Sequence, residues 1–151
     1  MYFQVARRVL VILSRILGLD DNYLWENVAA QEGVLPYSTY CRFQAVHPVP
    51  QEERATTGSL LQGHTDQGVI TLIPGQPVSC LQMCDARDGK WRYVPYMKDV
   101  IVANLGDVME VKSGGIFRAT RHRGEHPDGL GLLMRQSFSL LRIKRIWSVS
   151  P

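Results

Sequence analysis

Cysteine is scarce in this sequence of 151 residues. The three cysteines, Cys41, Cys80 and Cys84, form no CxxC pair, and an odd number cannot all be paired within one chain. A disulfide framework is therefore not expected, and the composition favours a reducing, cytoplasmic setting.

Long apolar runs are missing as well. The run Val9–Leu13 continues only to Leu19 and is interrupted by Arg15. A bilayer span needs about 20 predominantly apolar residues, so this run is too short and too charged to cross a membrane. No small-residue cleavage site follows it, which argues against a secretory signal. The sequence predicts no contact with a membrane.

The sequence also lacks a concentrated charge of one sign. Lys and Arg number 17 against 14 acidic residues, a formal net charge of +3. Binding of nucleic acid asks for a basic face, whereas these charges are scattered, and the short RIKR cluster at 142–145 is more typical of a solvated strand edge or tail. We therefore expect no nucleic-acid partner. The hydrophobic fraction of 45% is ordinary for one globular domain with a core.

Helical periodicity is confined to the start of the chain. Apolar residues recur at three- and four-residue steps from Val5 to Leu17, which predicts an amphipathic helix that ends at Gly18. Polar residues at 20–22 can cap a second short helix, which would run from Tyr23 toward Ala30. Residues 1–33 are accordingly predicted to form a helical segment.

Residues 34–151 have a different character. Their segments are short, rich in β-branched and aromatic residues, and separated by Gly, Pro, Asp and Asn. Many short strands at close spacing predict a mainly β domain, a sandwich or jelly roll rather than a βαβ fold. The expected strands are Tyr40–Val46, Ser59–Thr65, Val69–Ile73, Leu81–Cys84, Trp91–Val94, Val100–Asn104, Val108–Lys112, Arg118–His122 and Met134–Ile143.

Two connections between these strands have recognisable turn residues. Asp85–Gly89 is predicted to be a hairpin loop, and Asn104–Asp107 a tight turn between two strands. A Gly-Asp turn of this kind is structural far more often than catalytic, so we expect Asn104, Gly106 and Asp107 to serve the fold. Trp91 is expected to be a packed hairpin aromatic.

An HxD pair, His64 and Asp66, is the most specific local pattern. Residues two apart on a strand point to the same face, so this imidazole and carboxylate would project together. His122 is the best candidate for a third ligand, although spacing alone leaves His47 and His126 open. Two histidines and one carboxylate form the open-sided ligand set of iron(II) oxygenases. An HxD pair by itself is common by chance.

Further blocks surround this pair. They are GHTDQGVITLI at 63–73, QPVSCLQ at 76–82, GKW at 89–91, VP at 94–95, NLGD at 104–107, SGG at 113–115, RATRHR at 118–123 and RQS at 135–137. In this order they resemble the iron(II)/2-oxoglutarate-dependent oxygenase family that includes isopenicillin N synthase and the plant flavonoid and hormone oxygenases. The blocks QPVSCLQ and SGG most resemble those of the fungal members of this family, which act in secondary metabolism.

The resemblance implies a fold, cofactors and a ligand set. The fold is a double-stranded β-helix, a cupin-like jelly roll preceded by one or two N-terminal helices, with iron near one mouth. The cofactors are Fe(II), the co-substrate 2-oxoglutarate and O₂. His64, Asp66 and His122 match the family's iron ligands.

The resemblance also implies a binding site for 2-oxoglutarate. Arg135 and Ser137 match the pair that binds its distal carboxylate, where a guanidinium can make a bidentate contact. His47 stands where relatives carry a tyrosine that helps to orient 2-oxoglutarate, so it is a candidate pocket residue. Beyond Ser137, the chain departs from the family pattern.

The implied function is a dioxygenase that hydroxylates, desaturates or cyclises a small organic molecule in secondary-metabolite biosynthesis. Relatives have a further N-terminal half, so the sequence is interpreted as truncated. An exposed apolar seam is then expected, covered by a partner or by self-association. Two alternatives remain open, an iron-dependent oxidase that does not use 2-oxoglutarate and a catalytically inactive metal-binding remnant.

Overall fold

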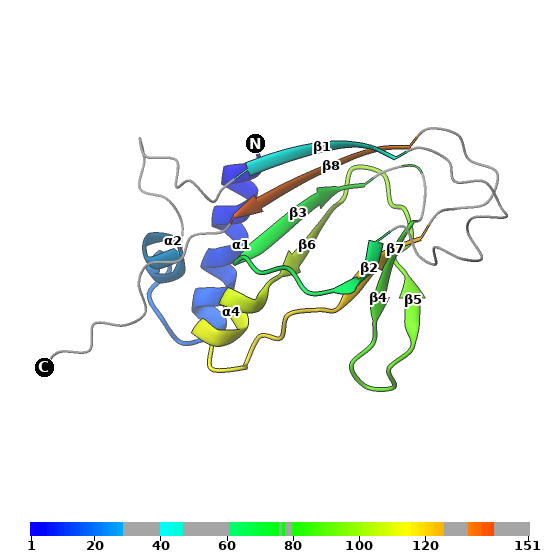
Figure 1. Cartoon of the computed structure of the whole chain (residues 1–151). Helices are drawn as coiled ribbons and strands as arrows, with labels where there is room; N and C mark the ends of the chain where they lie inside the picture. Colours follow the sequence, from blue (N-terminus) through cyan, green and yellow to red (C-terminus); the bar gives the residue numbers. More distant parts are fainter. Residues whose placement is uncertain (29–39, 47–60, 76, 78–79, 126–132, 141–151) are drawn as a thin grey trace, which may run out of the picture.

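The computed structural model describes residues 1–28, 40–46, 61–75, 77, 80–125 and 133–140 (Figure 1). Within these residues, two helices precede the strands, and one short helix lies between strands. The elements in chain order are α1 (Tyr2–Ile16), α2 (Tyr23–Val28), β1 (Tyr40–Val46), β2 (Leu61–His64), β3 (Ile70–Pro74), β4 (Leu81–Cys84), β5 (Trp91–Tyr93), β6 (Ile101–Leu105), α4 (Asp107–Lys112), β7 (His122–Gly124) and β8 (Leu133–Leu140).

The strands form two four-stranded antiparallel sheets. The first sheet has the order β1-β8-β3-β6 and the second sheet the order β2-β7-β4-β5. Apart from the β4–β5 hairpin, successive strands alternate between the sheets, which is the connectivity of a jelly roll. The predicted fold is therefore confirmed, including the helices before the barrel.

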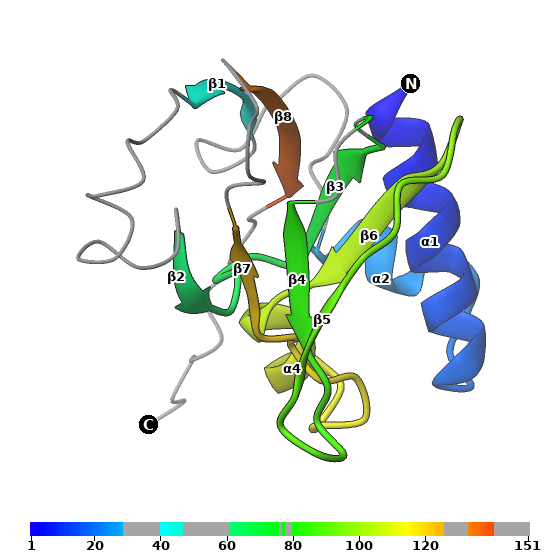
Figure 2. The same ribbon diagram turned by 90° about the vertical axis from the view of Figure 1, so that its right-hand side faces the viewer.

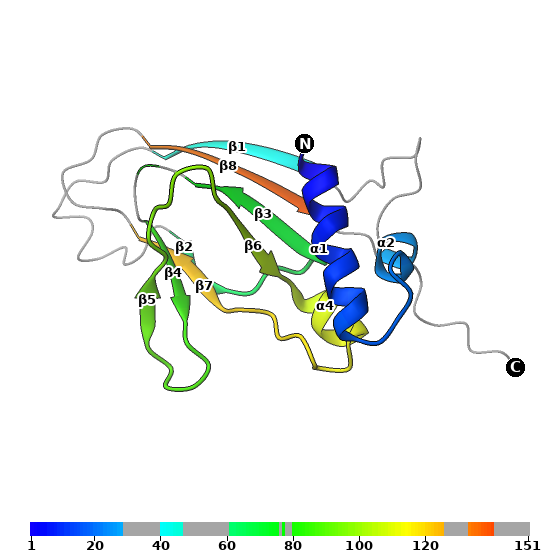
Figure 3. The ribbon, with the colours of Figure 1, turned by 180° about the vertical axis from the view of Figure 1, so that it is seen from behind.

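Helix α1 lies along the first sheet on the side away from the second sheet (Figures 2 and 3). Its apolar stripe meets the central strand β3, and the two elements share one hydrophobic core. Ile70 and Leu72 are completely buried against α1, because β3 has neighbours on both edges and is covered by the helix. The core cluster consists of Ala6, Leu10, Leu13, Leu24, Val69, Ile70, Leu72 and Met109.

The opposite side of α1 carries apolar side chains in contact with solvent. Ile12 is 56% exposed and Ile16 is 62% exposed. This agrees with the expectation of an exposed apolar seam, while its covering by a partner stays a prediction. Among the described residues, no helix is both long enough and apolar enough to span a membrane.

The hairpin predicted at Asp85–Gly89 is confirmed. It joins β4 to β5, with the Asp85 N–H donating to the Lys90 carbonyl at 2.9 Å and the Gly89 N–H donating to the Asp85 carbonyl at 2.8 Å. Gly89 has a φ of 69°, which a residue without a Cβ adopts at little cost. Asp85 also forms ion pairs with Arg87 and Arg92, so the loop is held by charges as well.

The strand predicted at Val108–Lys112 is wrong, because this segment is helix α4. Gly106 is its extended N-cap, and the first turn contains the acidic residues Asp107 and Glu110, which suit the positive end of a helix. The apolar pattern of five residues is too short to distinguish a strand from a helix. The Gly-Asp turn therefore joins a strand to a helix, not two strands.

The strand predicted at Arg118–His122 is shifted, since β7 covers His122–Gly124. The residues before it are tied to α4 instead of to a neighbouring strand. The Ala119 N–H donates to the Glu110 carboxylate at 2.6 Å, and the Phe117 N–H donates to the Ser113 hydroxyl at 3.0 Å. These side-chain acceptors replace the ladder partners that a strand would need.

Candidate metal centre

His64, Asp66 and His122 come together at the junction of β2 and β7. His64 is the last residue of β2 and lies directly opposite His122, the first residue of β7. Side chains on such opposite positions are immediate neighbours, and the two ring centroids are 4.4 Å apart. One ligand atom from each of the three residues lies within 4.8 Å of the others.

Asp66 lies outside the strand, because β2 ends at His64, so strand alternation does not place its side chain beside that of His64. Its position is fixed by the backbone instead. The Asp107 N–H at the start of α4 donates to the Asp66 carbonyl at 2.7 Å. The Asp66 Oδ1 then lies 3.9 Å from Nε2 of His64 and 3.7 Å from Nε2 of His122.

A carbonyl behind each ring sets the histidine tautomers. Nδ1 of His64 is 2.9 Å from the Gln62 carbonyl, and Nδ1 of His122 is 3.1 Å from the Thr120 carbonyl. A carbonyl can only accept, so each Nδ1 carries the hydrogen and donates it. In the neutral imidazole, each Nε2 then carries the lone pair and faces Asp66, which is the arrangement typical of metal-binding histidines.

Three lone-pair atoms therefore converge, two imidazole Nε2 atoms and one carboxylate oxygen. Such an arrangement is unfavourable by itself and becomes favourable when a cation lies between them. His122 is buried and Asp66 has 21% of its side chain exposed, whereas His64 is 37% exposed and faces the open side. The donor set and its open side fit a divalent transition metal.

Asn104 is a site residue that the sequence analysis assigned to the fold. It lies on β6, and its amide Nδ2 donates to Oδ2 of Asp66 at 2.8 Å. The same nitrogen lies 3.4 Å from Nδ1 of His122. The NLGD block was the available signal, but Asn104 and Asp66 are 38 positions apart in the sequence, so the contact forms only when the chain folds.

The expected 2-oxoglutarate residues are only partly described. Ser137 is half-buried on β8, opposite Arg42 of β1. Arg135 lies at the β8 position opposite Gln44, and its side chain is outside the described part. His47 and the alternative ligand His126 are also outside the described residues.

One row of residues crosses the first sheet beside the triad. Thr71 of β3 is opposite both Asn104 of β6 and Ser139 of β8. Opposite residues share a face, and Asn104 reaches the triad, so this face looks into the barrel. Ser137 is two residues from Ser139 and lies on the same face, in agreement with a role in the interior.

The outside of the second sheet supports the triad through Trp91. The Trp91 ring lies against Gly63, where an added Cβ would meet a ring carbon at 2.8 Å. The guanidinium of Arg123 lies 4.4 Å from the ring centroid and that of Arg121 lies 5.9 Å from it. Trp91 is thus packed, as predicted, and it explains why the residue before His64 is glycine.

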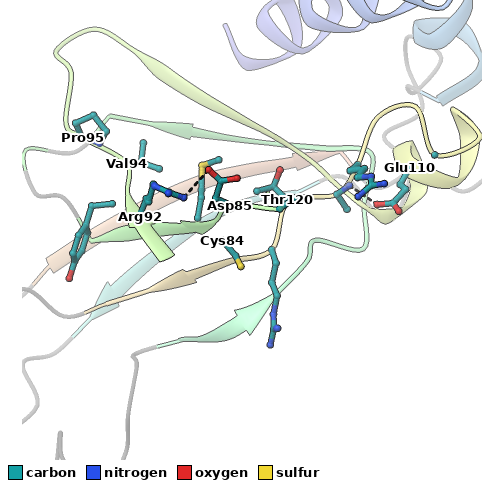
Figure 4. Close-up of a pocket in the computed structure, with 14 residues that line it drawn as sticks. Cys84, Asp85, Arg92, Val94, Pro95, Glu110 and Thr120 are labelled. Carbon is teal, nitrogen blue, oxygen red and sulfur yellow. Dashed lines mark hydrogen bonds and ion pairs between the residues drawn. The ribbon is translucent and has the colours of Figure 1, made fainter. Parts of the chain in front are cut away.

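A separate cavity lies between the β4–β5 hairpin and the segment that joins α4 to β7 (Figure 4). Two of the charged residues on its walls, Asp85 and Arg92, form an ion pair with each other. None of the triad residues is among its described lining residues. The residues labelled in the figure are Cys84, Asp85, Arg92, Val94, Pro95, Glu110 and Thr120.

Residues 37–137 match the family model of the 2OG-Fe(II) oxygenase superfamily. The chain is 33% identical over 120 residues to 1-aminocyclopropane-1-carboxylate oxidase 1 of Oryza sativa, covering 79% of this chain and 35% of the relative. It is 31% identical over 121 residues to leucoanthocyanidin dioxygenase of Malus domestica, covering 80% of this chain and 32% of the relative. The chain thus spans about a third of the length of these curated relatives.

Solved structures share the fold at lower identity. A full-length Neurospora crassa protein, in complex with alpha-KG, superposes with a TM-score of 0.75 at 20% identity, covering 91% of this chain and 45% of that one. Dioxygenase for auxin oxidation 1 of Arabidopsis thaliana, in a 2-oxoglutarate complex, gives a TM-score of 0.73 at 23% identity, covering 95% and 49% of the two chains.

Proposed function

The chain belongs to the 2OG-Fe(II) oxygenase superfamily, and from this premise we propose that it forms the iron-binding barrel of a 2-oxoglutarate-dependent dioxygenase. The observation that carries the proposal is the convergence of Nε2 of His64, Oδ1 of Asp66 and Nε2 of His122. These three atoms would hold Fe(II). In the proposed division of the chain, residues 34–151 form the dioxygenase domain and residues 1–33 a helical segment that braces it.

Bound Fe(II), together with 2-oxoglutarate and O₂, supplies an oxidation of an organic substrate that is coupled to the decarboxylation of 2-oxoglutarate to succinate. Three protein ligands leave coordination positions for the co-substrate and for O₂. The chain's own residues would orient the three ligands so that these coordination positions stay open. The carbonyls of Gln62 and Thr120 hold the two rings in the metal-binding tautomer, and the single carboxylate of Asp66 balances part of the metal charge.

Arg135 and Ser137 are proposed to bind the distal carboxylate of 2-oxoglutarate. A guanidinium can form two parallel hydrogen bonds with a carboxylate, and a hydroxyl can add a third. The place of Ser137 on the inner face of β8 supports this role. His47 is proposed as a further pocket residue that donates a hydrogen bond to 2-oxoglutarate.

The substrate class is proposed to be a small organic molecule of secondary metabolism. Relatives are named for 1-aminocyclopropane-1-carboxylate and leucoanthocyanidin, and the structural neighbour from Neurospora crassa has also been solved with thymine. These molecules share modest size and little else. The similarity therefore supports the size class of the substrate and leaves its identity to experiment.

An iron-dependent oxidase without 2-oxoglutarate is the second candidate, because several of the curated relatives are named oxidases. Arg135→Ala separates the two functions. A 2-oxoglutarate enzyme should lose most of its affinity for the co-substrate, since the bidentate partner of the distal carboxylate is gone. An oxidase should be unaffected by the change.

Anaerobic titration with Fe(II) and 2-oxoglutarate tests the proposal directly. Chelation of iron by 2-oxoglutarate should produce a metal-to-ligand charge-transfer band, and admission of air should yield succinate. A band with no succinate, even with candidate substrates, would favour a metal-binding remnant. Fe(II) binding without the band would exclude the 2-oxoglutarate enzyme.

A further inference from the structure

We propose that Asn104 is a positioning residue for the carboxylate of Asp66, which it holds so that only Oδ1 faces the metal position. The inference rests on the proposed metal site and deepens it. The Asn104 amide donates to Oδ2 of Asp66 at 2.8 Å, while Oδ1 points toward both Nε2 atoms. One oxygen of the carboxylate is therefore committed to the protein and the other to the metal.

The orientation of the Asn104 amide follows from its surroundings. Nδ1 of His122 donates its hydrogen to the Thr120 carbonyl and cannot accept a second one. The amide hydrogen of Asn104 therefore goes to Asp66. A flipped amide would place two acceptor oxygens 2.8 Å apart, which is repulsive.

The strand end that carries Asn104 also holds the backbone of Asp66. The Asp107 N–H donates to the Asp66 carbonyl at 2.7 Å. Gly106 lies so close that an added Cβ would meet the Asp66 carbonyl oxygen at 2.5 Å and the Gly68 carbonyl oxygen at 2.3 Å. The NLGD segment thus holds Asp66 at both its backbone and its side chain.

This arrangement has a consequence for the metal. A carboxylate with two free oxygens can bind a cation with both, and the second oxygen would then occupy a further coordination position. The hydrogen bond from Asn104 withdraws Oδ2, so Asp66 would offer a single oxygen to a bound metal. The positions that co-substrate and O₂ require stay open.

Thr71→Val is the matched control, because Thr71 lies opposite Asn104 in the same row of the first sheet. Thr71 is buried, and its hydroxyl lies 3.3 Å from the Ser139 hydroxyl. The control removes a polar interaction from the same part of the barrel, and within the described part of the chain this hydroxyl is bonded to Ser139 and not to the triad. It reports what a general loss of barrel stability does to metal binding.

Binding of Co(II) alone to the whole chain, followed by calorimetry and by its visible absorption, tests the inference. Asn104→Leu keeps the side-chain size and lacks the donor. We expect its Co(II) affinity to fall by about 10- to 100-fold, and its absorption bands to change as Oδ2 becomes free to coordinate. Thr71→Val should bind Co(II) within about twofold of the wild type with unchanged bands. If Asn104→Leu does not fold, Asn104→Ser is the second variant, because its shorter side chain holds the hydrogen-bond donor farther from Oδ2 of Asp66.

The outcomes separate this inference from the proposed function. Absence of Co(II) binding by the wild type would overturn the metal site itself. Wild-type binding together with equal affinity and identical bands in the Asn104 variants would overturn only the positioning role. Equal losses in the Asn104 and Thr71 variants, with bands unchanged, would show that Asn104 merely supports the fold.

Discussion

His64 and His122 lie directly opposite each other, and each ring donates to a carbonyl two residues earlier in the chain. At this residue scale, the family pattern was sufficient to predict which three residues meet, whereas strand alternation was not, because β2 ends at His64 before Asp66 is reached. Neither was sufficient to predict Asn104, because its contact with Asp66 depends on how β6 ends beside the loop after β2. Contacts between distant segments have no local sequence signal.

Gly63 should tolerate no side chain while Trp91 is present. Gly63→Ala places a Cβ 2.8 Å from a Trp91 ring carbon, and overpacking of this kind costs about 1–3 kcal/mol. Trp91→Phe removes the ring atoms that the Cβ meets. In urea denaturation, the double variant should therefore lose less stability than the sum of the two single variants. Strict additivity would show that the two residues do not oppose each other.

The hairpin and most strands were predictable at the scale of elements, because each combines a β-rich run with clear turn residues. Helix α4 was not predictable. The five residues predicted to form a strand fit the periodicity of a strand and of a helix equally well, so tertiary contacts decide which of the two forms. Met109 enters the core between α1 and β3, while Val111 is 67% exposed. The segment therefore forms a helix because this conformation buries Met109 and leaves Val111 in solvent.

Val111→Ala tests the helical assignment of this segment. In an exposed helix position alanine is favoured over valine, so the free energy of unfolding should stay equal or rise by up to about 0.7 kcal/mol. In a strand the same change should lower it, because valine is the better strand residue. Met109→Ala, the buried neighbour, should cost about 2–5 kcal/mol. Thermal or urea unfolding of both variants gives the answer.

The hairpin should lose order in acid through Asp85. Hydrogen bonds from the Arg87 side chain and backbone, with the charge of Arg92, hold the pKa of the Asp85 carboxyl far below its usual range. A lowered folded-state pKa stabilises the hairpin above the unfolded pKa of about 3.9, and this contribution is lost as the pH falls below it. Hydrogen exchange of the Asp85 and Gly89 amides, followed as the pH is lowered, measures this loss of hairpin stability.

The Asp85→Asn variant should show weaker protection of these amides at neutral pH and no further loss between about pH 4 and pH 2. Asp20→Asn, outside the hairpin, serves as the control and should keep the wild-type profile. A wild-type hairpin whose protection is constant through the acid range would contradict the role of the ion pairs.

The whole molecule is a jelly roll whose first sheet is covered by α1 on one face, while the triad lies on the side of the second sheet (Figure 2). The sequence predicted this architecture because helical periodicity and β-rich runs occupy separate parts of the chain. The exact position of the helix on β3 could not be predicted, since it depends on which apolar faces meet. Because α1 and β3 share one hydrophobic core, α1 contributes to the stability of the barrel domain.

Leu10→Ala tests whether α1 and the barrel unfold together. Leu10 is completely buried in the shared core, so its truncation should lower the free energy of unfolding by about 2–5 kcal/mol. The second sheet should melt at the same lowered temperature as the helix. Ile12→Ala, on the 56% exposed side of α1, should change stability by less than about 0.5 kcal/mol. Separate transitions for the helix and the sheets would contradict a single cooperative unit.

His64, Asp66 and His122 are proposed to form one metal site. Anaerobic Fe(II) titration of the wild type and of Asp66→Ala, with Asp20→Ala as an exposed carboxylate control, tests it most directly. We expect one tightly bound Fe(II) per chain in the wild type and in Asp20→Ala, and a loss of at least about 100-fold in affinity in Asp66→Ala. Unchanged Fe(II) affinity in a folded Asp66→Ala variant would contradict it.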